Sequence, residues 1–78
     1  MSIEEQVINI IRNQLDTPPE AIVPGASLLE DLGADSLDIT ELVIAMEEAF
    51  NIKIADDEVQ MIRTVQDAVD HVKASAGR

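Results

Sequence analysis

The chain has no cysteine, no tryptophan and no tyrosine, and it has a single phenylalanine. Because cysteine is absent, disulfides and thiolate metal ligands are excluded, which fits a reducing compartment. Because aromatic residues are almost absent, the chain lacks a platform on which nucleic-acid bases stack. No run of 18 or more apolar residues is present, so we expect no transmembrane helix. The acidic residues 1–5 lack the basic flank of a signal peptide, and we expect a cytoplasmic protein.

Basic residues are scarce as well. Sixteen Asp and Glu oppose five Lys and Arg among 78 residues, which gives a formal net charge of −11. Such a polyanion repels nucleic-acid phosphates and anionic membranes, so neither is an expected partner. Proteins with basic patches are the expected partners, found by electrostatic steering. The alternative is that the charge only keeps a small protein in solution. With 46% hydrophobic residues, the chain has the composition of one small folded domain rather than of a disordered acidic segment.

The sequence also lacks recognisable catalytic machinery. A nucleophilic serine needs a base beside it. The only histidine, His71, falls on the polar side of the last expected helix, where we expect it to face solvent. Ser36 lacks the flanking glycines of a hydrolase nucleophile elbow. The carboxylates around Ser36 do not have the spacing of a calcium-binding loop, and no glycine-rich phosphate loop is present. We therefore predict a protein that is not an enzyme and has no dedicated metal site.

Apolar residues recur at helical spacing in several stretches, which predict helices at about 3–15, 36–50, 56–61 and 65–74. Ser2 with Glu5, and Thr64 with Asp67, have the spacing of capping boxes. The sequence Thr17-Pro18-Pro19 ends the first helix, and Asn51 is a left-handed stop for the second.

Residues 16–35 hold all three prolines and two of the three glycines, and they predict a long connection with a single helical turn at Ser27. We expect apolar residues of this segment to hold it against the core: Ile22, Val23, Leu28, Leu29 and Leu32. The predicted fold is an all-α four-helix bundle with a short third helix and a long first connecting loop, formed by residues 1–78 as a single domain.

The helix at 36–50 has two different faces. At about 100° per residue, the core face holds Ile39, Leu42, Val43, Met46, Ala49 and Phe50. The opposite face holds Leu37, Glu41, Ile44 and Glu48, flanked by Thr40 and Glu47. Apolar side chains ringed by carboxylates are typical of a docking surface. The alternative is that isolated exposed apolar residues are common.

Ser36 stands where the connection becomes this helix. Gly33 predicts a turn, and Asp35 predicts a helix cap. The serine is either part of the cap or a site that carries a covalent phosphate, because a helix N-terminus favours anions. The residues alone leave both open.

The segment Asp35-Ser36-Leu37, preceded by Leu32-Gly33-Ala34 and followed by Asp38 and Glu41-Leu42-Val43, resembles the attachment motif of acyl carrier proteins. The resemblance is greatest to the discrete carriers of type II fatty-acid synthesis. It continues through the opening helix, residues 27–35, Glu47-Glu48-Ala49-Phe50 and residues 64–68. It implies that Ser36 carries a 4′-phosphopantetheine arm, which a phosphopantetheinyl transferase installs from coenzyme A. Growing acyl chains would then be carried on the arm as thioesters and delivered to the enzymes of fatty-acid biosynthesis.

The resemblance also assigns roles to the residues around Ser36. Asp35 and Leu37 match positions beside the arm. The acidic positions that dock on basic patches of partner enzymes are Asp38, Glu41, Glu47 and Glu48, and Ile44 matches an apolar contact position of the same partner-binding surface. Candidates for a pocket that shelters the acyl chain are Val43, Met46, Ile54 and Ile62, and a role as ordinary core suits them equally.

Four residues depart from the family pattern. Ala55 stands where the family usually has proline, Gln60 and Met61 replace commonly charged residues, and Arg63 adds a positive charge. These departures leave the pathway and the cargo open. A specialised carrier for a polyketide, lipid-A or other secondary pathway is one alternative, and an acidic helical adaptor without an arm is another. We expect a monomer.

Overall fold

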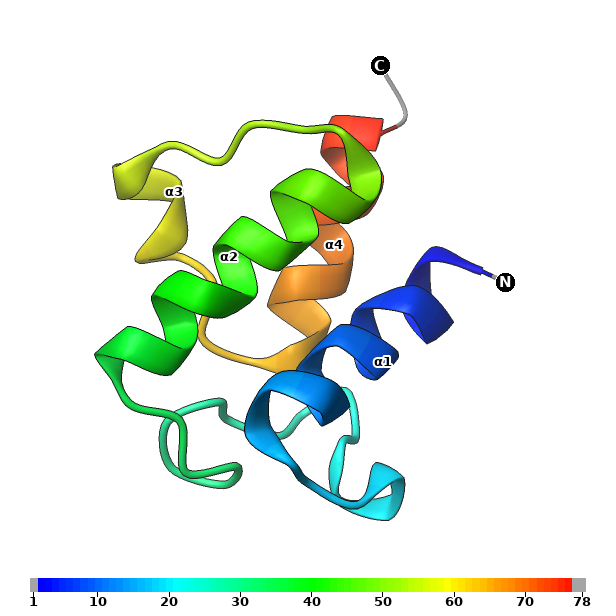
Figure 1. Cartoon of the computed structure of the whole chain (residues 1–78), viewed down its shortest axis with the longest axis vertical. Helices are drawn as coiled ribbons and strands as arrows, with labels where there is room; N and C mark the ends of the chain where they lie inside the picture. Colours follow the sequence, from blue (N-terminus) through cyan, green and yellow to red (C-terminus); the bar gives the residue numbers. More distant parts are fainter. Residues whose placement is uncertain (1, 77–78) are drawn as a thin grey trace.

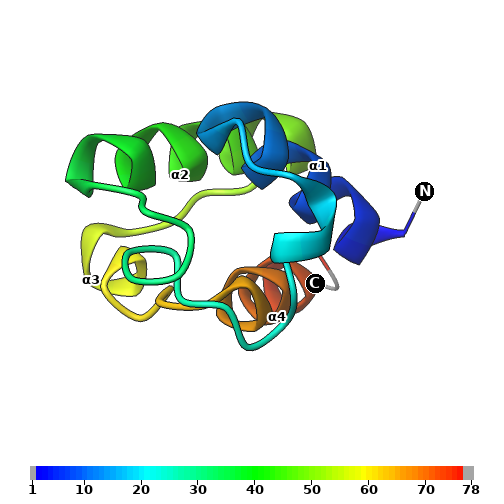
Figure 2. The same ribbon diagram turned by 90° about the horizontal axis from the view of Figure 1, so that it is seen from below.

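The computed structural model describes residues 2–76 of the chain, which form four α-helices. These are α1 (Ile3–Leu15), α2 (Ser36–Phe50), α3 (Asp56–Val59) and α4 (Val65–Ala76), with a short 3-10 helix η1 (Pro19–Ala21) in the first connection. Figure 1 shows the three longer helices around a common interior, with the short α3 at one edge. Figure 2 shows α1 and α2 in one layer and α3 and α4 in the other. The predicted all-α fold with a short third helix is confirmed.

Local capping signals set the helix ends. In the capping box of α1, Glu5 N donates to Ser2 Oγ at 3.1 Å. In that of α4, Asp67 N donates to Thr64 Oγ1 at 3.1 Å, and Thr64 N donates to Asp67 Oδ2 at 3.2 Å. Both boxes were predicted. Asn51 has φ of 54° and ends α2, which confirms the predicted left-handed stop.

Two helix ends differ from the prediction. The helix α3 ends at Val59 rather than at residue 61, because the chain tightens there into a 3-10-like turn in which Met61 N donates to Glu58 O at 3.0 Å. The helix α4 continues to Ala76 rather than ending at residue 74, in a segment whose alanines favour helix.

The core lies between α1, α2 and α4 and is closed by the connections. Its buried residues are Val7 and Ile11 of α1, Leu42, Val43 and Met46 of α2, Val65, Ala68, Val69 and Val72 of α4, and Ile22, Ala26, Leu28, Ala34, Ile54 and Ile62 of the connecting segments. The predicted core face of α2 is correct except at its edge. Ile39 and Phe50 are half-buried, and Ala49, which helical spacing places at the margin of this face, is exposed.

The long first connection is tied to the start of α4 by backbone hydrogen bonds. Ser27 and Thr64 form an isolated antiparallel bridge. Leu28 N donates to Arg63 O at 2.9 Å, and Val65 N donates to Ala26 O at 3.1 Å. The single helical turn predicted at Ser27 is present as one hydrogen-bonded turn, in which Asp31 N donates to Ser27 O at 3.0 Å, the spacing of an α-helical hydrogen bond.

The predicted apolar anchors of this connection are correct only in part. Ile22 and Leu28 are buried and Leu32 is half-buried, but Val23 is 50% exposed and Leu29 is 58% exposed. Val23 and Leu29 each directly follow one of the buried anchors, Ile22 and Leu28, and each is followed by an exposed residue.

His71 was predicted to face solvent, and this was wrong. Its side chain is 19% exposed, and Nε2 lies 3.0 Å from Oε2 of Glu58. Glu58 belongs to α3, which covers this side of α4. The helical pattern of α4 alone contains no information about that cover.

Within residues 2–76, every helix is too short or too polar to span a bilayer.

Candidate functional site

Ser36 is the first residue of α2, and the turn before it fixes its position. Gly33 has φ of +72°, in the left-handed region that favours glycine. Ala34 is buried, and its N–H donates to Leu28 O at 2.8 Å. The chain therefore approaches α2 from a point anchored in the core, and the start of the helix is held in place.

Asp35, and not Ser36, caps the helix. Asp38 N donates to Asp35 Oδ1 at 2.9 Å, and Asp35 N donates to Asp38 Oδ2 at 3.2 Å. Ser36 is exposed, and among residues 2–76 the structure gives its hydroxyl no hydrogen-bond partner. Its carbonyl accepts a hydrogen bond from Thr40 Oγ1 at 3.0 Å. Of the two roles that the sequence left open, the cap thus belongs to Asp35, and the serine hydroxyl is left accessible.

A groove opens beside Ser36 with a volume of about 450 Å³. One side is formed by the first turns of α2 and the other by the segment from Val59 to Arg63. The lining residues are Leu29, Ser36, Ile39, Thr40, Val59, Gln60, Ile62 and Arg63. Helical spacing places Ile39 and Thr40 on the face of Ser36, so this part was available from the sequence. Gln60 and Arg63 come from a distant segment that only the fold brings here.

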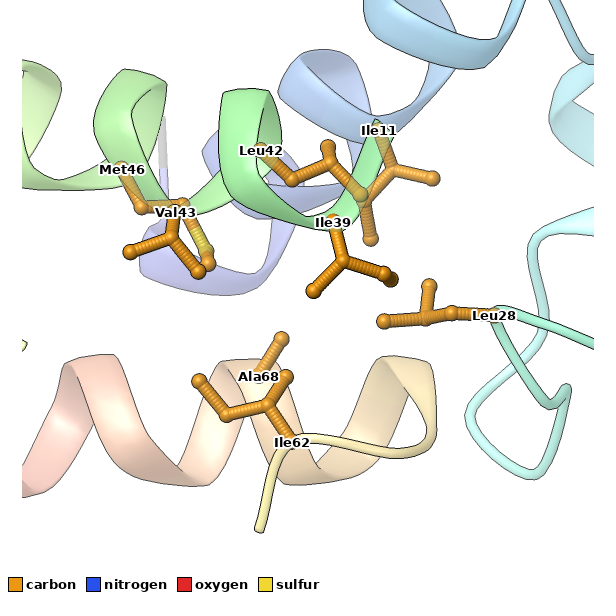
Figure 3. Close-up of a pocket in the computed structure, with 8 residues that line it drawn as sticks. All are labelled: Ile11, Leu28, Ile39, Leu42, Val43, Met46, Ile62 and Ala68. Carbon is orange, nitrogen blue, oxygen red and sulfur yellow. The ribbon is translucent and has the colours of Figure 1, made fainter. Parts of the chain in front are cut away.

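A small apolar void lies in the core behind this groove. Figure 3 shows its lining side chains pointing toward one another from α1, α2, α4 and two connections. They are Ile11, Leu28, Ile39, Leu42, Val43, Met46, Ile62 and Ala68, and the void measures about 10 Å³. Ile39 and Ile62 line both the void and the groove, so these two side chains separate the core from the surface at Ser36.

The pocket candidates are divided between two places. Val43, Met46 and Ile62 line the void. Ile54 is buried but lies along another surface depression, with Ile44 and Glu47. Val43 lines this depression as well as the void, so it connects the two places.

The predicted docking residues follow the outer face of α2. Leu37 is 64% exposed and Ile44 is 48% exposed, and Glu41 and Glu48 are exposed between and beyond them. The outer face therefore does combine apolar side chains with carboxylates.

Three of its four carboxylates also have partners within the chain. Asp38 is half-buried in the cap of α2, and Gln14 Nε2 donates to Glu41 Oε2. Glu47 Oε2 accepts from Ile54 N at 2.8 Å. Only Glu48 has no such partner among residues 2–76.

In the described part of the chain, no three carboxylate, imidazole or thiol side chains converge in a way that could hold a metal ion.

Comparisons with known proteins agree with this geometry. The family model described as "Phosphopantetheine attachment site" matches residues 5–72. A curated acyl carrier protein from Nitratidesulfovibrio vulgaris strain Miyazaki F is 55% identical over 73 residues, which are 94% of this chain and 96% of that protein. The chain belongs to the acyl carrier protein family. The acyl carrier protein of strain Hildenborough of the same species is 56% identical over 72 residues, which are 92% of this chain and 95% of that protein.

Membership of this family gives the chain a carrier role, with 4′-phosphopantetheine as its prosthetic group. The residues at Ser36 fit that group. Attachment needs a hydroxyl that a second protein can reach, and the Ser36 hydroxyl is exposed and has no hydrogen-bond partner in the described part of the chain. The adjoining groove has apolar walls and polar side chains at Thr40, Gln60 and Arg63, which suits an arm with both methyl and amide groups.

Proposed function

We propose that Ser36 is the attachment residue, and that this carrier holds growing acyl chains for the enzymes of fatty-acid biosynthesis without catalysing a reaction itself. The observation that carries the proposal is the position of Ser36: exposed, outside the cap and at the mouth of a groove. When bound, the prosthetic group supplies a thiol on which acyl chains are held as thioesters. The chain's own residues anchor, present and shelter that group.

The outer face of α2 is the proposed docking surface for partner enzymes, including the phosphopantetheinyl transferase. Glu41 and Glu48 are exposed and supply charge for steering toward basic patches, and Leu37 and Ile44 supply apolar contact. Asp35 and Leu37 flank the attachment site.

Two further carboxylates of this surface have a double role in the proposal. Asp38 completes the cap of α2, and Glu47 holds the backbone of Ile54. Substitution of either therefore affects the local structure as well as the docking surface. Glu48 is the position where docking is tested without that complication.

The void in the core is the proposed start of a shelter for the acyl chain. At about 10 Å³ it has room for about one water molecule, so an acyl chain enters only when its lining side chains move apart. Because Ile39 and Ile62 line both the void and the groove, they are the side chains that must separate first. Val43 and Met46 form the apolar wall behind them. Ile54 would join the shelter only if it widened toward the depression that Ile54 lines.

Analysis of the cargo in the native cell tests this function. The tagged chain and its Ser36→Ala variant are isolated, and their acyl-phosphopantetheine groups are released and identified by mass spectrometry. On the wild-type chain we expect a series of straight-chain acyl groups that differ by two-carbon steps. On the Ser36→Ala variant we expect none. A single specialised acyl group would contradict the fatty-acid role and favour a dedicated pathway. No phosphopantetheine on either protein would contradict the carrier assignment of Ser36.

A further inference from the structure

Arg63 is the one cationic residue among the eight that line the groove beside Ser36. The chain has only five Lys and Arg against sixteen Asp and Glu, so positive charge is scarce. The Arg63 side chain is exposed and has no carboxylate partner within residues 2–76. In that part of the chain, the one contact between a basic side chain and a carboxylate joins His71 and Glu58. A free guanidinium therefore lies on the groove, in a molecule that is acidic almost everywhere else.

The backbone of Arg63 is held on both sides. Its N–H donates to Asp67 Oδ2 at 3.2 Å, and its carbonyl accepts from Leu28 N at 2.9 Å. Arg63 thus stands at the junction between the capping box of α4 and the bridge to the first connection. Its position along the groove is fixed even though its side chain is free.

A phosphodiester on Ser36 would lie close to two carboxylates. Asp35 is its neighbour in the chain and Asp38 is two residues further on, and the two are bound to each other's backbone N–H groups in the cap. Negative charge added at Ser36 is therefore repelled by groups that cannot turn away without breaking the cap. A guanidinium is the side chain best suited to offset this repulsion, because its planar fork matches phosphate oxygens.

We propose that Arg63 is a positioning residue for the prosthetic arm: its guanidinium pairs with the phosphodiester on Ser36 and holds the arm along the groove over Ile39, Val59 and Ile62. The inference rests on the proposed attachment at Ser36. It assigns a function to a residue that departs from the family pattern, and it predicts two states of the loaded carrier, one with the arm held in the groove and one with it released. A partner's basic patch would favour release by competing with Arg63 for the phosphate.

The test compares apo and loaded protein by the backbone amide shifts of Gln60 and Ile62 in NMR spectra. The variants are Arg63→Gln, Arg63→Lys and the matched control Lys53→Gln, which removes one positive charge from an exposed residue outside the groove. Intact mass first confirms that each protein is fully loaded. Circular dichroism confirms the fold, which we expect to be unchanged because the hydrogen bonds of Arg63 use only its backbone.

An exposed ion pair changes an equilibrium roughly 1.5- to 5-fold, so Arg63→Gln should lower the ratio of held to released arm by that factor. The loading-dependent shifts should shrink in Arg63→Gln, shrink less in Arg63→Lys and stay unchanged in Lys53→Gln. Raising NaCl to about 0.5 M should reduce the loading-dependent shifts in the wild-type chain, because salt screens the pair between the guanidinium and the phosphodiester.

Equal shifts in Arg63→Gln and Lys53→Gln, with all proteins loaded, would overturn the role of Arg63 and leave the proposed function intact. If Arg63→Gln did not fold, equal loading-dependent shifts in Arg63→Lys and in the wild-type chain at both salt concentrations would overturn the role of Arg63. Failure to load the wild-type chain with phosphopantetheine would overturn the proposed function and this inference together.

Discussion

The cap of α2 gives a sharp prediction, because one side chain both ends the loop and begins the functional helix. Asp35→Ala removes the carboxylate that accepts the hydrogen bond from Asp38 N at 2.9 Å. The backbone N–H of residue 38 then loses its partner at a helix start. Asp38 can still accept from the N–H of residue 35, so only half of the capping box is lost.

The expected cost is about 1 kcal/mol, within the range of roughly 0.5–2 kcal/mol measured for loss of an N-cap. In a domain of 78 residues, 1 kcal/mol lowers Tm by about 4–8 °C. Removal of a negative charge near Asp38 offsets a few tenths of a kcal/mol of this cost, on the scale of surface charge pairs. Asp35→Asn is the matched control, because it removes the same charge and keeps an oxygen that caps equally well.

Urea titration and thermal melts followed by circular dichroism measure both variants. The wild-type chain and Asp35→Asn should have similar urea midpoints. Asp35→Ala should have a lower urea midpoint with an unchanged m-value. If Asp35→Ala and Asp35→Asn were equally stable, the cap hydrogen bond would contribute nothing. The reasoning about how Ser36 is presented would then fail.

Three further predictions address the turn, the charge and the docking surface. Gly33→Ala should lower the free energy of unfolding by about 1–2 kcal/mol in a urea titration, because a residue with a Cβ rarely adopts its φ of +72°. Gly25→Ala should cost less than half as much, because Gly25 does not have such a φ and both sites have open space for a Cβ. Tm should rise with NaCl, and rise further with MgCl₂ at equal ionic strength, because the net charge of −11 repels itself; a flat response would contradict this. Glu48→Lys should raise the KM of the phosphopantetheinyl transferase for this protein on the order of fivefold and leave its helicity unchanged. The control Glu20→Lys, an equal charge change in η1, should leave this KM unchanged. Equal effects of the two substitutions would remove α2 as the docking surface.

Features encoded by neighbouring residues were predictable. Ser2 with Glu5 begins α1, Thr64 with Asp67 begins α4, and Asn51 ends α2, because each signal and its hydrogen-bond partner lie within one helical turn. The exposure of Leu37 and Ile44 also followed from helical spacing.

Features that depend on distant segments were not predictable. The partial burial of His71 comes from its contact with Glu58 of α3, which the pattern of α4 does not show. The groove beside Ser36 needs Gln60 and Arg63, which the fold brings to α2 from beyond α3. Nothing in the local sequence around Ser36 indicates these two neighbours.

Apolar content alone was also an unreliable guide to burial in the connection. Val23 and Leu29 are exposed, whereas the small residues Ala26 and Ala34 are buried. The bridge between Ser27 and Thr64 ties this connection to the start of α4, and that pairing joins residues 37 positions apart, so the local sequence does not reveal it.

The central claim is that Ser36 carries the prosthetic group. The most direct test incubates the purified chain with coenzyme A and a broad-specificity phosphopantetheinyl transferase and measures intact mass, followed by peptide mapping. We predict a single phosphopantetheine addition that maps to Ser36, persists in the control Ser75→Ala and is absent from Ser36→Ala. An unmodified mass, or an addition that remains in Ser36→Ala, would contradict the claim.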